Sequence, residues 1–183
     1  QFRVQGIPAV KAFRDGKVAE EFTGAIPPRQ VEEFFNRLVP SDAELAAADA
    51  IRSGDEDELR AAVEADPRNV AAATALAKIL MSRGEYDEAV NLLDELPQDF
   101  AAAGLAARAW LAAHRPELED AFAAWDAGDH AAALEKLQDA FASAGDDETR
   151  DRIRRVMVAI FTELGTDSEL ARQHRRRLAT ALY

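Results

Sequence analysis

Residues 76–96 read LAKILMSRGEYDEAVNLLDEL, and this stretch decides the fold of most of the chain. Apolar residues at helical spacing stand on both sides of Gly84, at Leu76, Ala77, Leu80, Ala89, Leu93 and Leu96. A glycine readily takes the backbone conformation in which one helix stops before the next begins. The stretch therefore predicts two amphipathic helices joined by a tight turn at Gly84, with their apolar faces packed together.

The turn at Gly84 recurs along the chain. Its pattern is a glycine, an acidic residue, and a small or apolar residue five positions after the glycine, at Gly54–Leu59, Gly84–Ala89 and Gly128–Ala133. Further breaks punctuate the chain at Pro67, Pro97, Pro116, Gly145 and Gly165. They divide it into helices of about 10 to 18 residues, as expected for an array of antiparallel helix pairs.

The recurring turn resembles the inter-helix turn of a tetratricopeptide repeat. We therefore expect a mainly α protein, with a tetratricopeptide-like helical repeat domain over residues 41–183. Repeat register makes Thr74, Lys78 and Met81 candidates for the groove of such an array. Phe122 and Trp125 have two interpretations, the packed core and the groove, and we assign them to the core.

Residues 1–39 follow a different pattern. Gly6-Ile7-Pro8 precedes an apolar strand, and Asp15-Gly16 is a hairpin turn signal before a second strand that ends at Gly24. Pro27-Pro28 then begins a helix, where a missing N–H costs nothing. The segment predicts a β-hairpin followed by a helix. One interpretation is a small independent cap on the helical domain.

The other interpretation of residues 1–39 rests on resemblance. GIPAVKAFRDGKVAEEFTGA at 6–25 and VEEFF at 31–35 are similar to the end of a thioredoxin domain, whose first two-thirds are absent here. The resemblance implies that Pro8 is the cis-proline and that the backbone of Ile7 faces substrate. Without its covering helices, the hairpin is expected to self-associate with another copy or to pack onto the helical body.

Both halves together resemble the bacterial tetratricopeptide-repeat thioredoxins, which are YbbN-like co-chaperones also called chaperedoxins. The resemblance implies a cytoplasmic holdase that binds unfolding client proteins and hands them to chaperone machinery. It also implies that a chaperonin or other chaperone docks on the C-terminal helix. The residues that we expect on the partner side are Arg176, Leu178, Leu182 and Tyr183.

Composition excludes several classes of function. The net charge is −12, and residues 41–147 alone carry 8 basic and 24 acidic side chains, which opposes binding to nucleic acid. No apolar run is long enough to span a membrane. The chain has no cysteine, its three histidines are far apart, and it contains no glycine-rich phosphate loop. We therefore expect no enzyme activity, no metal and no cofactor in this chain.

Residues 148–183 reverse the charge, with 8 basic and 5 acidic side chains. Two interpretations remain open for them, a solvated helix face and a docking site for an acidic partner.

Three hypotheses for the function of the whole protein follow from these observations. The first is the holdase and adaptor. The second is the substrate-selecting repeat domain of a thioredoxin-type oxidoreductase. The third is a scaffold for peptide tails, in which Lys78 is the only groove candidate for a cationic clamp.

Overall fold

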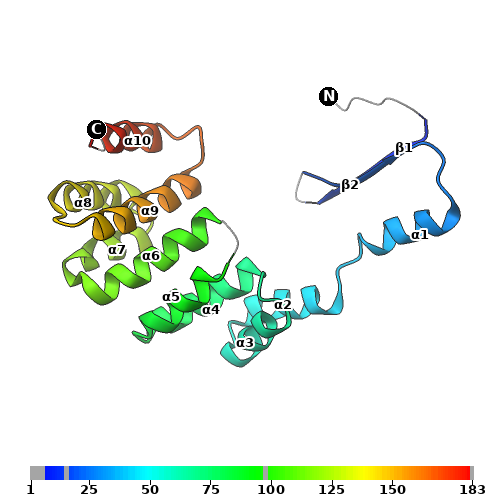
Figure 1. Cartoon of the computed structure of the whole chain (residues 1–183), viewed down its shortest axis with the longest axis horizontal. Coiled ribbons are helices and arrows are strands. Elements are labelled where there is room, and N and C mark those ends of the chain that lie inside the picture. The colour runs from blue at the N-terminus through cyan, green and yellow to red at the C-terminus, as the bar shows by residue number, and fades with distance from the viewer. Residues whose placement is uncertain (1–6, 15–16, 97–98, 182–183) are drawn as a thin grey trace. The chain divides into compact units, whose positions relative to one another are not determined.

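The computed structural model describes residues 7–14, 17–96 and 99–181. Contacts divide the chain into two compact units, residues 1–45 and residues 46–183, which are described separately (Figure 1). The sequence predicted this division at residue 40, in the turn before the helix Asp42–Ser53. In the structure the division falls within that helix, after Leu45. Proposals that fall on Asp15-Gly16, Pro97, Leu182 and Tyr183 lie outside the described residues.

The first unit is a β-hairpin followed by a helix. Strand β1 (Ala9–Arg14) pairs antiparallel with β2 (Lys17–Thr23), and α1 (Pro28–Asn36) follows. The hairpin register places Val10 opposite Phe22, and the Lys11 ammonium pairs with the Glu21 carboxylate across the strands. The Ile7–Pro8 peptide bond, at the cis-proline candidate, is cis.

One aromatic contact holds α1 to the hairpin. Phe34 is buried, and its ring meets that of Phe22 edge to face with 4.9 Å between centroids. The Arg37 guanidinium, just after α1, donates to Glu20 of β2 at 3.2 Å. Phe13 and Phe35 are about half exposed, so this small core covers only part of the apolar surface of the unit.

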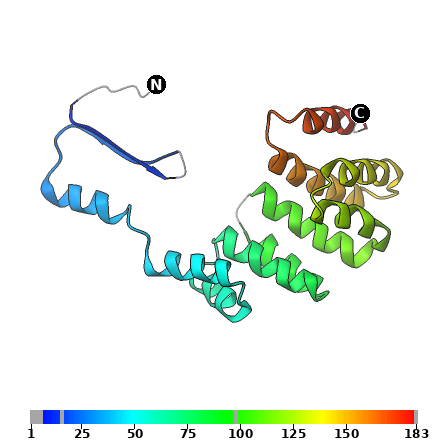
Figure 2. The same ribbon diagram turned by 180° about the vertical axis from the view of Figure 1, so that it is seen from behind.

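The second unit is entirely helical over its described residues (Figures 1 and 2). Its first five helices are α2 (Asp42–Ser53, which begins in the first unit), α3 (Glu56–Ala65), α4 (Val70–Ser82), α5 (Tyr86–Asp94) and α6 (Phe100–His114). The remaining elements are the short 3₁₀ helix η1 (Pro116–Leu118), α7 (Glu119–Asp126), α8 (His130–Ser143), α9 (Asp147–Leu164) and α10 (Glu169–Ala181).

Local sequence explains where these helices begin and end. Each of five helices is preceded by a polar residue whose side chain accepts from the backbone N–H three positions on, and these caps are Asp55, Asn69, Asp99, Asp129 and Asp146. Ser41 and Glu44 form a reciprocal capping box at α2. The three predicted repeat turns all carry glycines with positive φ, at Gly54, Gly84 and Gly128. The expected mainly α array is therefore confirmed.

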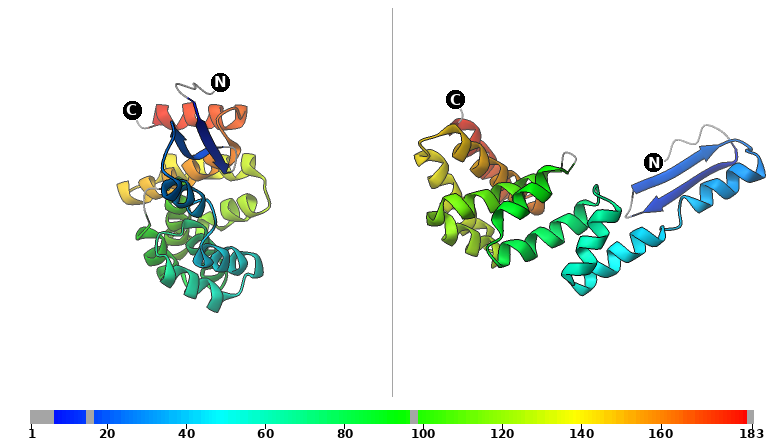
Figure 3. Two further views of the ribbon diagram at one scale, coloured as in Figure 1. Left: turned by 90° about the vertical axis from the view of Figure 1, so that its right-hand side faces the viewer. Right: turned by 60° about the horizontal axis from the view of Figure 1, so that its bottom comes forward.

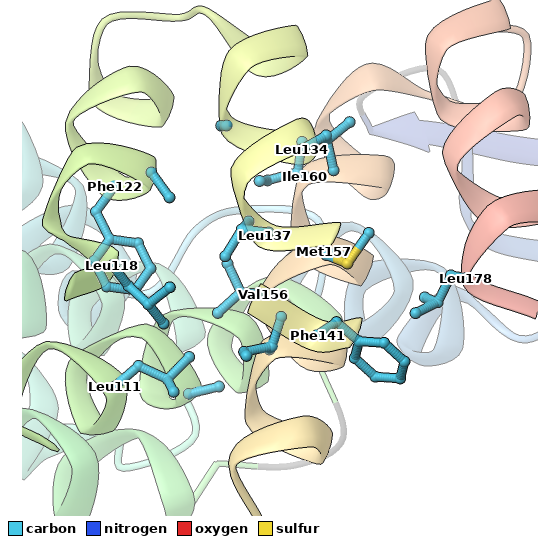
Figure 4. Packing of buried hydrophobic residues seen from close by; sticks show 14 of the residues in the cluster. Leu111, Leu118, Phe122, Leu134, Leu137, Phe141, Val156, Met157, Ile160 and Leu178 are labelled. Atoms are coloured by element: carbon cyan, nitrogen blue, oxygen red, sulfur yellow. The ribbon is translucent and has the colours of Figure 1, made fainter. Parts of the chain in front are cut away.

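Helix α6 is shared by two apolar clusters. One cluster is built from α2 to α6 and includes Leu59, Leu76 and Leu105. The other runs from α6 to α10, and Figure 4 shows Leu137, Phe141 and Met157 among its buried members. Because alanines supply many of the α6 contacts to both clusters, neighbouring helices approach that helix closely.

Helices α6 and α9 approach one another closely and pack side by side (Figure 3). A Cβ atom added at Gly104 would overlap the Cβ of Ala159 and lie 3.1 Å from the backbone oxygen of Arg155. Gly104 is therefore needed here for its lack of a side chain, not for its turn conformation.

The last helix, α10, docks through a buried histidine. His174 is 1% exposed, and its Nδ1 has no hydrogen-bond partner among the residues that the structure describes, while its Nε2 lies 4.0 Å from Glu135 of α8. Arg177 donates to the same Glu135 carboxylate at 2.8 Å. Burial lowers the pKa of His174; Glu135 partly opposes this shift and Arg177 adds to it.

Candidate partner-binding groove

A groove of about 650 Å³ opens on the helical unit. Side chains from α4 to α7 line it, and in Figure 1 α6 lies between the α4–α5 pair and α7. Its lining residues include Lys78, Met81, Leu105, Arg108, Glu119 and Phe122. A hollow of this size, part apolar and part charged, suits the side chains of a bound peptide.

Helix α4 places two of these side chains. Its N-terminus is fixed by Asn69, whose side chain accepts from the backbone N–H of Ala72. Lys78 and Met81 stand three residues apart on this helix and so share one face. Lys78 is exposed and Met81 is half-buried, with its side chain also packed against the first core cluster.

The Arg108 guanidinium links α6 to α7. It forms a two-pronged ion pair with Asp126, at 2.7 and 2.5 Å. The same guanidinium lies 5.3 Å from the ring centroid of Phe122 and 5.2 Å from that of Trp125. Because Arg108 is only 17% exposed and packs on two aromatic faces, its guanidinium makes more contacts than that of an ordinary surface ion pair.

Phe122 and Trp125 have different surroundings. Phe122 is buried beside Leu118 in the second core cluster, as Figure 4 shows, and one side of it also lines the groove. Trp125 is partly buried and its indole N–H donates to Glu163 of α9 at 2.8 Å. The two interpretations of Phe122 thus both apply, because one ring contributes to the core and to the groove.

The comparisons with known families agree with this architecture. Two family models match, each described as tetratricopeptide repeat, one over residues 48–113 and the other over residues 112–183. Residues 48–183 form a tetratricopeptide-repeat domain. The two matches meet at the end of α6, the helix that both core clusters share. Such repeats mediate protein–protein interaction, so the groove lies in a domain of a protein-binding class. No curated protein matches the chain significantly.

The tetratricopeptide-repeat groove contains two of the three residues that repeat register proposed. Lys78 and Met81 line it, whereas Thr74, one turn earlier on α4, is half-buried and is not among the lining residues. The contributions of Leu105 and Arg108 were missed. No glycine-acid turn adjoins helix α6 in the sequence, so the repeat pattern could not be aligned there to predict which α6 residues face the groove.

The proposed partner residues of α10 lie outside this groove. Arg176 is exposed and its guanidinium lies 3.5 Å from Glu169. Leu178 is 6% exposed and packs in the second core cluster, so most of its contacts are internal. It also borders a smaller hollow of about 350 Å³ together with Phe100, Phe161 and Arg175.

A network of exposed ion pairs lies outside the groove lining. Glu56 of α3 accepts from Arg83 at 2.6 and 3.0 Å and from Arg60 at 2.9 Å. Arg60 also donates to Glu88 of α5 at 2.6 Å. The hydrogen bond from Arg83, and to a smaller extent the one from Arg60, lowers the pKa of Glu56. This carboxylate therefore stays ionised at lower pH than an isolated glutamate does.

The described residues present no grouping of three or more His, Cys, Asp or Glu side chains suited to a metal ion. Over the same part of the chain, no helix combines the length and the apolar character required to cross a bilayer. The groove has an apolar floor with charged edges, a combination typical of protein-binding surfaces.

Proposed function

We propose that this chain is a protein-binding co-chaperone that holds segments of unfolding client proteins in the groove and passes them to chaperone machinery in the cytoplasm. The observation that carries the proposal is the groove itself, where Met81, Leu105 and Phe122 present apolar surface beside exposed charges. Unfolding proteins expose apolar side chains, and burying them is favourable by about 25 cal/mol per Å².

Such a function requires binding and release, and no covalent chemistry. The proposal therefore assigns no catalytic residue and no cofactor to this chain. Delivery to a chaperonin or another chaperone is proposed through the outer face of α10, where Arg176 is exposed. Because Leu178 packs inward, Arg176 is the better of these two positions at which to disturb docking without disturbing the fold.

A second candidate function is favoured by one observation in the first unit. The hairpin of β1 and β2 is followed by the helix α1, which is the order of elements at the end of a thioredoxin domain. On this alternative the repeats select substrates for a thioredoxin-type protein-disulfide oxidoreductase. The redox cysteines would then belong to another segment, since these residues include none.

The test is suppression of aggregation of a thermally unfolding reporter protein, measured by light scattering without ATP. The test variant is Met81→Glu, which adds a charge to the apolar floor of the groove. The matched control is Ile51→Glu, at a 39% exposed apolar position of α2 that does not line the groove. We expect the wild type and the control to suppress scattering equally, and Met81→Glu to suppress it much less.

Equal suppression by Met81→Glu and the control would contradict the use of this groove. Absence of suppression by the wild type would contradict the holdase function altogether. Circular dichroism of both variants must match the wild type, because Met81 also touches the core cluster.

A further inference from the structure

The charges that line the groove fall into two groups. Arg108 and Asp126 neutralise one another through their two-pronged ion pair. Arg115 is neutralised by Glu117, which accepts from its guanidinium at 2.6 Å. These charges are compensated within the domain and have little net attraction left for a ligand.

Two lining charges remain, and they have opposite signs. Lys78 of α4 and Glu119 of α7 are both exposed, and neither has an ion-pair partner among the residues that the structure describes. They stand on different helices, and α6, which also lines the groove, lies between those two helices in the chain. The groove is thus an apolar floor with one uncompensated cation and one uncompensated anion.

We propose that this groove selects segments in which an apolar anchor lies between one acidic and one basic side chain. The apolar side chain packs against Met81 and Leu105, the acidic one pairs with Lys78, and the basic one pairs with Glu119. This inference rests on the proposed function, because it names the chemistry of the segment that the same groove holds.

Charge complementarity at short range supports this occupant over a purely basic one. The acidic body of the protein attracts any cation, but at physiological salt that attraction fades over about 8 Å. Ion pairs formed directly with Lys78 and Glu119 act at contact distance, well within that range. An exposed ion pair contributes about 0.2–1 kcal/mol, which corresponds to about a 1.4- to 5-fold change in affinity.

The test uses four fluorescein-labelled peptides with the same Leu-Phe anchor, measured by fluorescence anisotropy. Their flanking side chains are one Asp and one Lys, two Asp, two Lys, or two Ser. We expect the wild-type chain to bind the mixed peptide tightest, by about two- to fivefold over the others.

Charge-exchange variants sharpen the test. Lys78→Glu should transfer the preference to the peptide with two Lys, and Glu119→Lys should transfer it to the peptide with two Asp. The double variant restores one charge of each sign and should prefer the mixed peptide again. Arg68→Glu, at an exposed position outside the groove, is the control and should leave the order of affinities unchanged.

Two results would overturn the inference, and they can be told apart. If all four peptides bind, if Met81→Glu abolishes binding, and if the charge variants leave the order unchanged, the groove binds peptides without reading charge. If the anchor peptides do not bind, or bind equally to Met81→Glu, the proposed function of the groove fails as well.

Discussion

Replacing Gly104 with alanine tests the packing on which the whole domain depends. In an exposed helix this change stabilises a protein by about 0.5–1 kcal/mol, because alanine is the better helix former. Here the added Cβ would overlap that of Ala159 on α9 and lie 3.1 Å from the backbone oxygen of Arg155. Both neighbours belong to a rigid helix, so the two helices must separate.

The expected magnitude follows from these opposing effects. Overpacking a well-packed core costs about 1–3 kcal/mol, and the gain in helix propensity offsets up to about 1 kcal/mol of it. Because the added Cβ meets a Cβ and a backbone oxygen, neither of which can rotate away, the cost should lie in the upper part of that range, about 2–3 kcal/mol. We therefore expect Gly104→Ala to lower the free energy of unfolding by about 1–2 kcal/mol. For a chain of this size that corresponds to a decrease of about 2–8 °C in Tm.

Urea unfolding followed by tryptophan fluorescence is the assay, since Trp110 on α6 and Trp125 on α7 both report on this domain. The control is Ala159→Gly, alone and combined with Gly104→Ala. In the double variant the methyl group moves from α9 to α6 and the overlap disappears. We expect the double variant to be more stable than the sum of the single changes predicts, by about 1 kcal/mol or more.

A neutral or stabilising Gly104→Ala variant, additive with Ala159→Gly, would refute the close packing of α6 on α9. It would also place the α6 lining of the groove in doubt, because Leu105 and Arg108 come from the same helix.

Three further predictions concern the core, a turn and the last helix. Leu137 is fully buried, so Leu137→Ala should lower the free energy of unfolding by about 2–5 kcal/mol in urea titrations. Leu45 is about half exposed, so Leu45→Ala should lower it by well under half of that amount. Gly128 has a φ of 76° with open space around it, so Gly128→Ala should cost about 1–2 kcal/mol through backbone strain alone, and Gly128→Asn should cost less in the same titration. Burial lowers the pKa of His174 in the folded protein, so between about pH 7 and 5 the unfolded chain binds more protons than the folded one. The free energy of unfolding should therefore fall as the pH drops through this range. In thermal melts, His174→Gln should weaken the dependence of Tm on pH over this range. An unchanged dependence would contradict its assignment to His174.

Much of the fold follows from local signals in the sequence. Gly54, Gly84 and Gly128 mark turns that need positive φ, and only glycine takes that conformation at little cost. Polar residues such as Asn69 and Asp129 mark the helix starts that follow. These signals are local, so they can be recognised without knowing which helices come together.

The groove was only partly predictable, because it depends on contacts between distant segments. Repeat register from α4 proposed Lys78 and Met81, but Leu105 and Arg108 belong to a helix with no turn signal of its own. The ion pair that joins Arg108 to Asp126 spans eighteen positions of sequence and has no local signature. The dual contribution of Phe122 to the core and the groove likewise requires the packed structure.

The central claim, that the groove holds segments of unfolding proteins, is tested most directly by photo-crosslinking. Met81→p-benzoylphenylalanine places the crosslinker on the groove floor, and Ile51→p-benzoylphenylalanine places it on α2, outside the groove. Each variant is irradiated with a thermally unfolding reporter protein, and the products are mapped by mass spectrometry. The account predicts crosslinks to apolar segments of the unfolding reporter from position 81 and few from position 51. Equal yields from the two positions, or none from position 81, would contradict it.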